Sequence, residues 1–169
     1  MAAMRGLPAT DEVFLDSLRG EDVMGAVVRA HIHIEARVNR VLRALTPHPN
    51  HLPKNLRYEQ AVRLAVAMGL HERILEPLKI LGQIRNDFAH DLAATLTDRM
   101  ANLLLESFSS DDREVIEGAY SMTNTQLATT DMPPLKDAST RNKFIFAAIA
   151  MDKFLIIAEA DALSHRAAI

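Results

Sequence analysis

Residues 23–45 read VMGAVVRAHIHIEARVNRVLRAL, and this stretch decides the fold. Apolar residues recur in it at steps of three and four, the spacing that places side chains on one face of an α-helix. The stripe consists of Val23, Val27, Ala30, Ile34, Val38, Val41 and Leu45. The stretch therefore predicts a long, buried helix that begins near Glu21-Asp22 and is ended by Thr46-Pro47.

The same periodicity, together with capping residues, predicts helices on both sides of this stretch. They cover residues 10–20, 57–68, 71–90, 95–108 and 109–120, and the last one begins at 139 or 140. Gly69 should end the helix over 57–68, and Pro77 either kinks the helix over 71–90 or starts a new one. Gly82 has no side chain, so another backbone could approach there. We expect an all-α fold, an antiparallel helical bundle of five to seven helices.

The length of 169 residues suits one domain with a hydrophobic core. We expect a flexible N-terminus over residues 1–9 and a single helical domain over residues 10–169. Within that domain, residues 121–138 are rich in Thr, contain Pro133-Pro134 and show no periodicity. This segment predicts a mobile loop.

The composition excludes several classes of site. The chain has no Cys, which removes disulfides, thiolate catalysis and Cys-type zinc sites.

Residues 144–163 are apolar, but four charged residues interrupt them: Asp152, Lys153, Glu159 and Asp161. Such charges are costly in lipid. We therefore expect a buried helix there rather than a membrane span. With no secretory signal in residues 1–10, the predicted location is the cytoplasm.

The charge is unevenly distributed along the chain. The net charge is −3, which argues against a dedicated binder of duplex DNA. Residues 29–63 nevertheless contain seven basic and two acidic residues. Four of the side chains on the helix over 23–45 cluster opposite its apolar stripe and are candidate nucleic-acid-binding residues: Arg29, His33, Arg40 and Arg43. The alternative for this basic arc is a solvated helix face.

The run Arg85-Asn86-Asp87-Phe88-Ala89-His90 is the one sharp chemical signature. A His titrates near neutral pH, and an Arg offers a planar charged fork to phosphate. On an ideal helix Arg85 and His90 lie about 140° apart, whereas Asn86 and His90 share a face. A joint Arg–His site therefore needs a helix break near 87–90 or residues from two subunits. The alternative is structural: Arg85 and Asn86 close a helix, and His90 bonds locally.

Arg85 to His90 resembles the R-x4-H signature of the HEPN superfamily, with a polar residue directly after the Arg. Residues 14–45 and 61–90 look similar to the mannitol operon repressor-like (MltR-like) branch, so the resemblance covers about half of the chain. It implies a helical bundle, a homodimer whose motifs face each other, and a metal-independent endoribonuclease of the toxin or defence type. RNA would be the substrate, and an antitoxin or a regulator the protein partner.

By the same resemblance, Arg85 would bind the phosphate and His90 would be the acid or base. Asn86 would be the partner that orients the site. The alternative is a non-catalytic MltR-like transcriptional regulator or interaction module, and Asp87 and Asp91 favour it because their charge opposes RNA phosphates.

The apolar faces of the two long helices are broader than one seam of a bundle needs. A symmetric dimer would explain this width, and so would one central helix buried in a monomer.

No metal and no cofactor are predicted. His31 and Glu35 share a helix face, but His33 points elsewhere, and no third ligand is placed by the sequence. The chain also lacks a Gly-rich phosphate loop and the common hydrolase and metalloprotease motifs.

Overall fold

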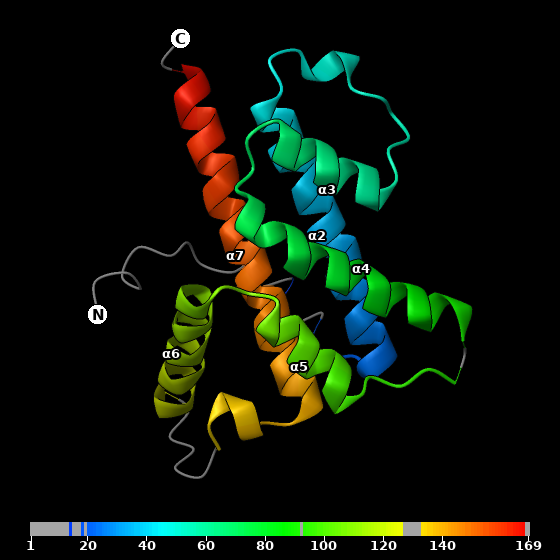
Figure 1. The fold of residues 1–169 in the computed structure, drawn as a ribbon, viewed down its shortest axis with the longest axis vertical. Coiled ribbons are helices and arrows are strands. Elements are labelled where there is room, and N and C mark those ends of the chain that lie inside the picture. Colours follow the sequence, from blue (N-terminus) through cyan, green and yellow to red (C-terminus); the bar gives the residue numbers. More distant parts are fainter. Residues whose placement is uncertain (1–13, 15–17, 19, 92, 127–132, 168–169) are drawn as a thin grey trace.

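The computed structural model describes residues 14, 18, 20–91, 93–126 and 133–167. Within these ranges it contains six α-helices and no strand, so the all-α prediction is confirmed (Figure 1). The helices are α2 (Val23–Leu45), α3 (Tyr58–Ala67), α4 (Leu75–His90), α5 (Asp98–Glu106), α6 (Ser110–Gln126) and α7 (Thr140–Ala167). None of them is long and apolar enough to cross a membrane.

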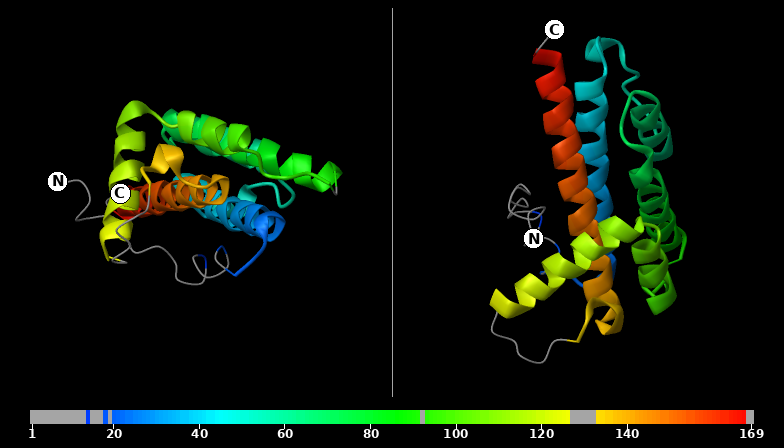
Figure 2. Two further views of the ribbon diagram at one scale, coloured as in Figure 1. Left: turned by 90° about the horizontal axis from the view of Figure 1, so that it is seen from below. Right: turned by 60° about the vertical axis from the view of Figure 1, so that its left-hand side comes forward.

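The two longest helices, α2 and α7, lie side by side and run parallel (Figures 1 and 2). Their contacts keep a constant offset along the chain: His33 with Asp152, Arg40 with Glu159, and Arg166 with Pro47 are each separated by 119 residues. The predicted antiparallel arrangement therefore does not extend to this pair. Only short loops force neighbouring helices to be antiparallel, and residues 46–139 separate these two.

The core follows the apolar stripe of α2. Val27, Ala30, Ile34, Val38 and Val41 are each 0% exposed. Burial of a Val, Leu or Ile side chain contributes about 1.5–3 kcal/mol, so this stripe is a main source of stability. From α7 the core receives Phe144, Ala147, Ala148, Met151 and Leu155. Helices α3 and α4 form a second layer over α2 (Figure 2), and α5 crosses α7 (Figure 1).

The helix ends agree with the local signals in the sequence. The Asp22 side chain accepts a hydrogen bond of 2.7 Å from the backbone N–H of Gly25 and caps α2. Thr97 caps α5 in the same way at 3.3 Å. Gly69 has a φ of 118°, in the left-handed region that favours glycine, and it follows the end of α3.

Two predicted helix boundaries were wrong. The helix expected over 71–90 begins at Leu75, after a 3₁₀ turn over Glu72–Ile74, and Pro77 lies buried in its first turn. Proline is tolerated there because the N–H groups of the first turn have no partner within the helix. Pro77 therefore marks the start of a helix.

The second error concerns residues 121–138. Helix α6 continues to Gln126, and a 3₁₀ turn spans Leu135–Asp137. The buried Tyr120 ring packs edge-on against Phe146 at 4.8 Å, and extending an anchored helix adds one hydrogen bond per residue fixed. The remaining part, residues 127–132, lies outside the described residues. So do the expected flexible N-terminus and most of the expected helix over 10–20, where only Phe14 and Leu18 are described, both buried.

Candidate functional site

Arg85, Asn86 and His90 lie on the last two turns of α4, and all three are exposed. Ile84 and Phe88, on the opposite side of the helix, are buried in the core and hold this end of α4 in place. In Figure 1 the end of α4 points away from the centre of the molecule. The site residues are thus presented to solvent on a firmly packed helix.

Helix α4 is unbroken through His90, and the N–H of Asp91 still bonds to the carbonyl of Asp87 at 3.1 Å. Of the two routes to a joint Arg–His site, a helix break is therefore ruled out. On a regular helix, Arg85 and His90 project about 140° apart. Arg85 donates a 3.1 Å hydrogen bond to Asn86 Oδ1, so these two neighbours are joined while His90 is not.

A cleft of about 720 Å³ lies between α2, α3 and α4, and Arg85 and Asn86 form part of its wall. Helix α2 contributes His31 and Glu35, and α3 contributes Tyr58 among others. His90 is not among the lining residues. Within one chain, the histidine that shares a cavity with Arg85 is therefore His31, which the motif alone does not indicate.

His31 is 5% exposed and packs against the Tyr58 ring at a centroid distance of 4.5 Å. Burial, followed by the charge of Arg85, lowers the pKa of His31 to about 4. The ring is thus neutral at pH 7. Its Nδ1 lies 3.8 Å from Glu35 Oε2, which confirms that His31 and Glu35 share a helix face. This distance is too long for a hydrogen bond.

Tyr58 ties the three helices around the cleft together. Its hydroxyl donates a 2.9 Å hydrogen bond to the carbonyl of Leu78, and burial, then the charge of Glu35, raises the pKa of that hydroxyl. The ring lies against Gly82, where an added Cβ would be 3.0 Å from Tyr58 Cε1. The sequence predicted a close approach at Gly82, but the partner is an aromatic ring rather than a backbone.

The predicted nucleic-acid-binding arc is largely neutralised by acidic side chains. Arg29 pairs with Glu21 at 2.6 Å, His33 with Asp152 at 2.9 Å, and Arg40 with Glu159 at 3.4 Å. Arg43 is exposed on the last turn of α2. Since two of the three acidic partners come from α7, more than a hundred residues away, the sequence could not show this compensation.

The Asp152 carboxylate is fully buried, and its Oδ1 accepts hydrogen bonds from both His33 Nε2 and Arg37 Nε, each 2.9 Å long. Burial raises the pKa of Asp152, but the bonds and charges of His33 and Arg37 outweigh it, so the pKa stays below its usual value. His33 is turned toward this cluster and stacks on Phe14 at 3.9 Å. It therefore does not join His31 and Glu35, and among the described residues no metal-ligand cluster forms.

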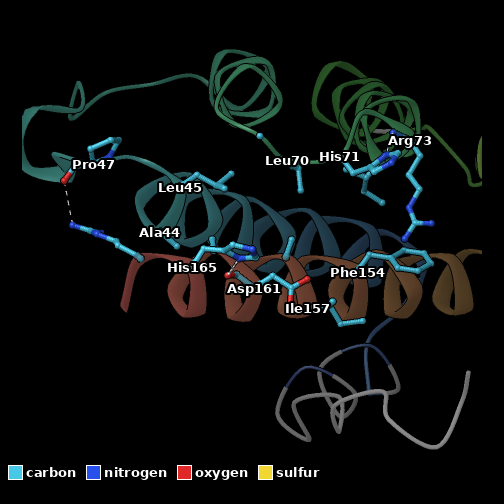
Figure 3. Close-up of a pocket in the computed structure, with 15 residues that line it drawn as sticks. Ala44, Leu45, Pro47, Leu70, His71, Arg73, Phe154, Ile157, Asp161 and His165 are labelled. Carbon is cyan, nitrogen blue, oxygen red and sulfur yellow. Dashed lines mark hydrogen bonds between the residues drawn. The ribbon is translucent and has the colours of Figure 1, made fainter. Parts of the chain in front are cut away.

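A second hollow of about 680 Å³ lies beside the C-terminal end of α2. It is enclosed by α2, the α3–α4 connection and α7 (Figure 3). Its walls are apolar, with Leu45, Leu70, Phe154 and Ile157 among them. In Figure 3 the Arg73 side chain extends over the Phe154 ring, and its guanidinium lies 5.4 Å from the ring centroid. None of the predicted site residues lines this hollow.

Comparisons of the chain with models of known protein families, with curated proteins and with solved structures find no match. The case for a function therefore rests on the residues of the site.

Proposed function

We propose that this chain is a HEPN-type homodimer and a metal-independent endoribonuclease with a site made of Arg85, Asn86 and His90. One observation carries the proposal: Arg85 and His90 are both exposed at the end of α4, but they project from different faces of an unbroken helix. A second copy is the remaining way to bring them to one phosphate. The R-x4-H resemblance supplies the chemistry.

In this mechanism His90 takes the proton of a ribose 2′-hydroxyl or gives one to the leaving 5′-oxygen. The 2′-oxygen forms a bond to phosphorus, the bond to the 5′-oxygen breaks, and a 2′,3′-cyclic phosphate results. Arg85 binds the phosphate as negative charge builds on its oxygens. Asn86 holds the Arg85 guanidinium through the 3.1 Å hydrogen bond. In the described part of the chain no carboxylate pairs with Arg85, so its charge is available to a substrate.

The test is cleavage of single-stranded RNA by the purified protein in the presence of EDTA. Wild type should cut and leave cyclic phosphate ends, and His90→Ala should lose most of the activity. His48→Ala is the matched control, because His48 is also an exposed histidine but lies in the loop after α2. Equal RNA turnover by wild type and His90→Ala would refute the enzyme proposal. Growth arrest on expression gives the same comparison in cells.

The second candidate is a non-catalytic regulator or interaction module of the MltR-like kind. It is favoured by the exposed apolar side chains of α2, where Ile32 is 60% and Val28 37% exposed. Asp87 and Asp91, both exposed beside the motif, repel RNA phosphates. This candidate predicts no cleavage by wild type and specific retention of promoter DNA at physiological salt. Binding no stronger than to unrelated DNA would argue against the DNA-binding form of it.

A further inference from the structure

We propose that the cleft between α2, α3 and α4 binds the phosphate and polar base of a nucleotide, with Arg57 and Arg85 as its cationic ligands and His31 at its floor. This binding role deepens the proposed function, on which it rests for the view that the nucleotide belongs to an RNA strand. The volume of about 720 Å³ lies within the range of small-molecule sites, about 300–1,000 Å³.

The charges of the cleft point to an anion. Four basic residues and three carboxylates line it. Two of the basic residues are neutralised within their own helices, because Arg63 pairs with Glu59 at 2.9 Å and Lys79 with Glu76 at 3.2 Å.

Arg57 and Arg85 have no carboxylate within ion-pair distance in the described ranges. They come from the N-cap of α3 and from α4, so they line the cleft from two helices. Guanidinium groups match the geometry of phosphate oxygens and hold them with charge-assisted hydrogen bonds.

His31 supplies a second, independent polar group at the cleft. The residue is only 5% exposed and lines the cleft, and neither ring nitrogen has a hydrogen bond to any residue in the described part of the chain. Neither nitrogen is among the fully buried unpaired atoms of that part of the chain, so a ligand in the cleft can reach them. A neutral imidazole offers one donor and one acceptor, which suits a ribose hydroxyl or a base edge next to a bound phosphate.

The remaining lining residues agree with a nucleotide rather than with phosphate alone. Gln83 and Asn86 also line the cleft, and side-chain amides can bond to base edges. Glu35 is the one carboxylate of the lining without an Arg or Lys partner among the described residues, and it lies nearest to His31. It opposes an anion at the floor, so the phosphate belongs on the arginine side of the cleft.

The experiment measures binding of uridine 5′-monophosphate, uridine and inorganic phosphate to the full chain by calorimetry at low salt. We expect the monophosphate to bind more tightly than either fragment and more weakly as salt rises. Arg57→Gln should weaken binding by about tenfold, since one charge-assisted hydrogen bond is lost. Arg63→Gln is the matched control on the same helix and cleft, and it should change binding by less than about twofold, because Glu59 already neutralises Arg63.

Equal affinity for uridine and its monophosphate, or equal effects of the two arginine substitutions, would overturn the assignment. Tighter binding of inorganic phosphate than of the monophosphate would show an anion site without a nucleotide role, and would overturn it as well. His90→Ala separates this role from the proposed function: it should abolish cleavage, while the roughly tenfold effect of Arg57→Gln on monophosphate binding should persist in the His90→Ala background, because His90 does not line the cleft of its own chain. If wild type cuts no RNA but binds the monophosphate through Arg57, the enzyme proposal fails and the binding site stands.

The His31 ring gives a second readout on unmodified protein. Its side-chain ¹⁵N chemical shifts should move when uridine 5′-monophosphate is added, while those of the exposed His48 should not. Unchanged His31 shifts at saturating monophosphate would remove His31 from the site.

Discussion

His33 Nε2 lies 2.9 Å from Asp152 Oδ1, which joins α2 to α7 at the middle of their parallel pair. Arg37 Nε bonds to the same oxygen at 2.9 Å, while Asp152 Oδ2 has no hydrogen-bond partner. A single buried carboxylate therefore holds two side chains of α2. Its removal would leave His33 and Arg37 partly buried without their acceptor.

Asp152→Ala should consequently destabilise the fold by about 3–5 kcal/mol, the range for breaking a buried ion pair from one side. Denaturant unfolding at pH 7 measures it. Glu159→Ala is the control, because Glu159 contacts Arg37 and Arg40 from the same face of α7 but is partly exposed. Such exposed ion pairs contribute only about 0–1 kcal/mol to stability. A loss at Asp152 no larger than at Glu159 would contradict the role given to the cluster.

The stability of the fold should fall as the solution is acidified from pH 6.5 to pH 4. The cause is His31, whose pKa is about 4 in the folded chain against 6.5 as its ordinary value. Between these values the unfolded chain binds more protons, so acid favours unfolding, by about 3 kcal/mol over the window. Unfolding free energies measured at several pH values test this.

His31→Gln supplies the control for that pH dependence, because it keeps a neutral polar side chain that does not titrate. The variant should lose most of the slope between pH 6.5 and pH 4. An unchanged slope would show that other groups cause it.

Asp152 affects stability in a different pH window. Its pKa is lowered, so its contribution to the stability of the fold is present above pH 3.8 and is lost only below that value.

Gly82→Ala should destabilise the protein by about 1 kcal/mol, although alanine is the better helix former by about that amount. The new Cβ would lie 3.0 Å from Tyr58 Cε1, and the ring cannot easily retreat because its hydroxyl bonds to Leu78 and its face meets His31. Thermal unfolding measures the change. In a Tyr58→Leu background the same substitution should be neutral or stabilising; an equal loss in both backgrounds would exclude this contact as the cause.

A mixture of Arg85→Ala and His90→Ala chains should regain ribonuclease activity that neither variant has alone. If each site takes Arg85 from one copy and His90 from the other, a mixed dimer contains one intact site. Random exchange of subunits then restores about one quarter of the wild-type activity. The control is the Arg85→Ala/His90→Ala double variant mixed with Arg85→Ala, which contains no intact site. Full inactivity of the first mixture, with exchange shown by mass spectrometry, would rule out a shared site.

Much of the local structure could be predicted from the amino-acid sequence alone. The spacing of Val27, Ile34 and Val41 predicted the buried face of α2, and Asp22, Thr97 and Gly69 predicted helix ends. These features depend on neighbours within a few residues, so periodicity and capping chemistry determine them. The unbroken helix through His90 was one of two alternatives that the spacing left open.

Contacts between distant segments could be decided only by the tertiary structure. The parallel course of α2 and α7, the pairing of His33 and Arg40 with acidic residues of α7, and the shared cleft of His31 and Arg85 all join residues more than fifty positions apart. Helical periodicity shows which face of a helix is apolar, but it does not show which other helix covers that face. The packing of the helices makes that choice, and it determined which histidine shares a cleft with Arg85.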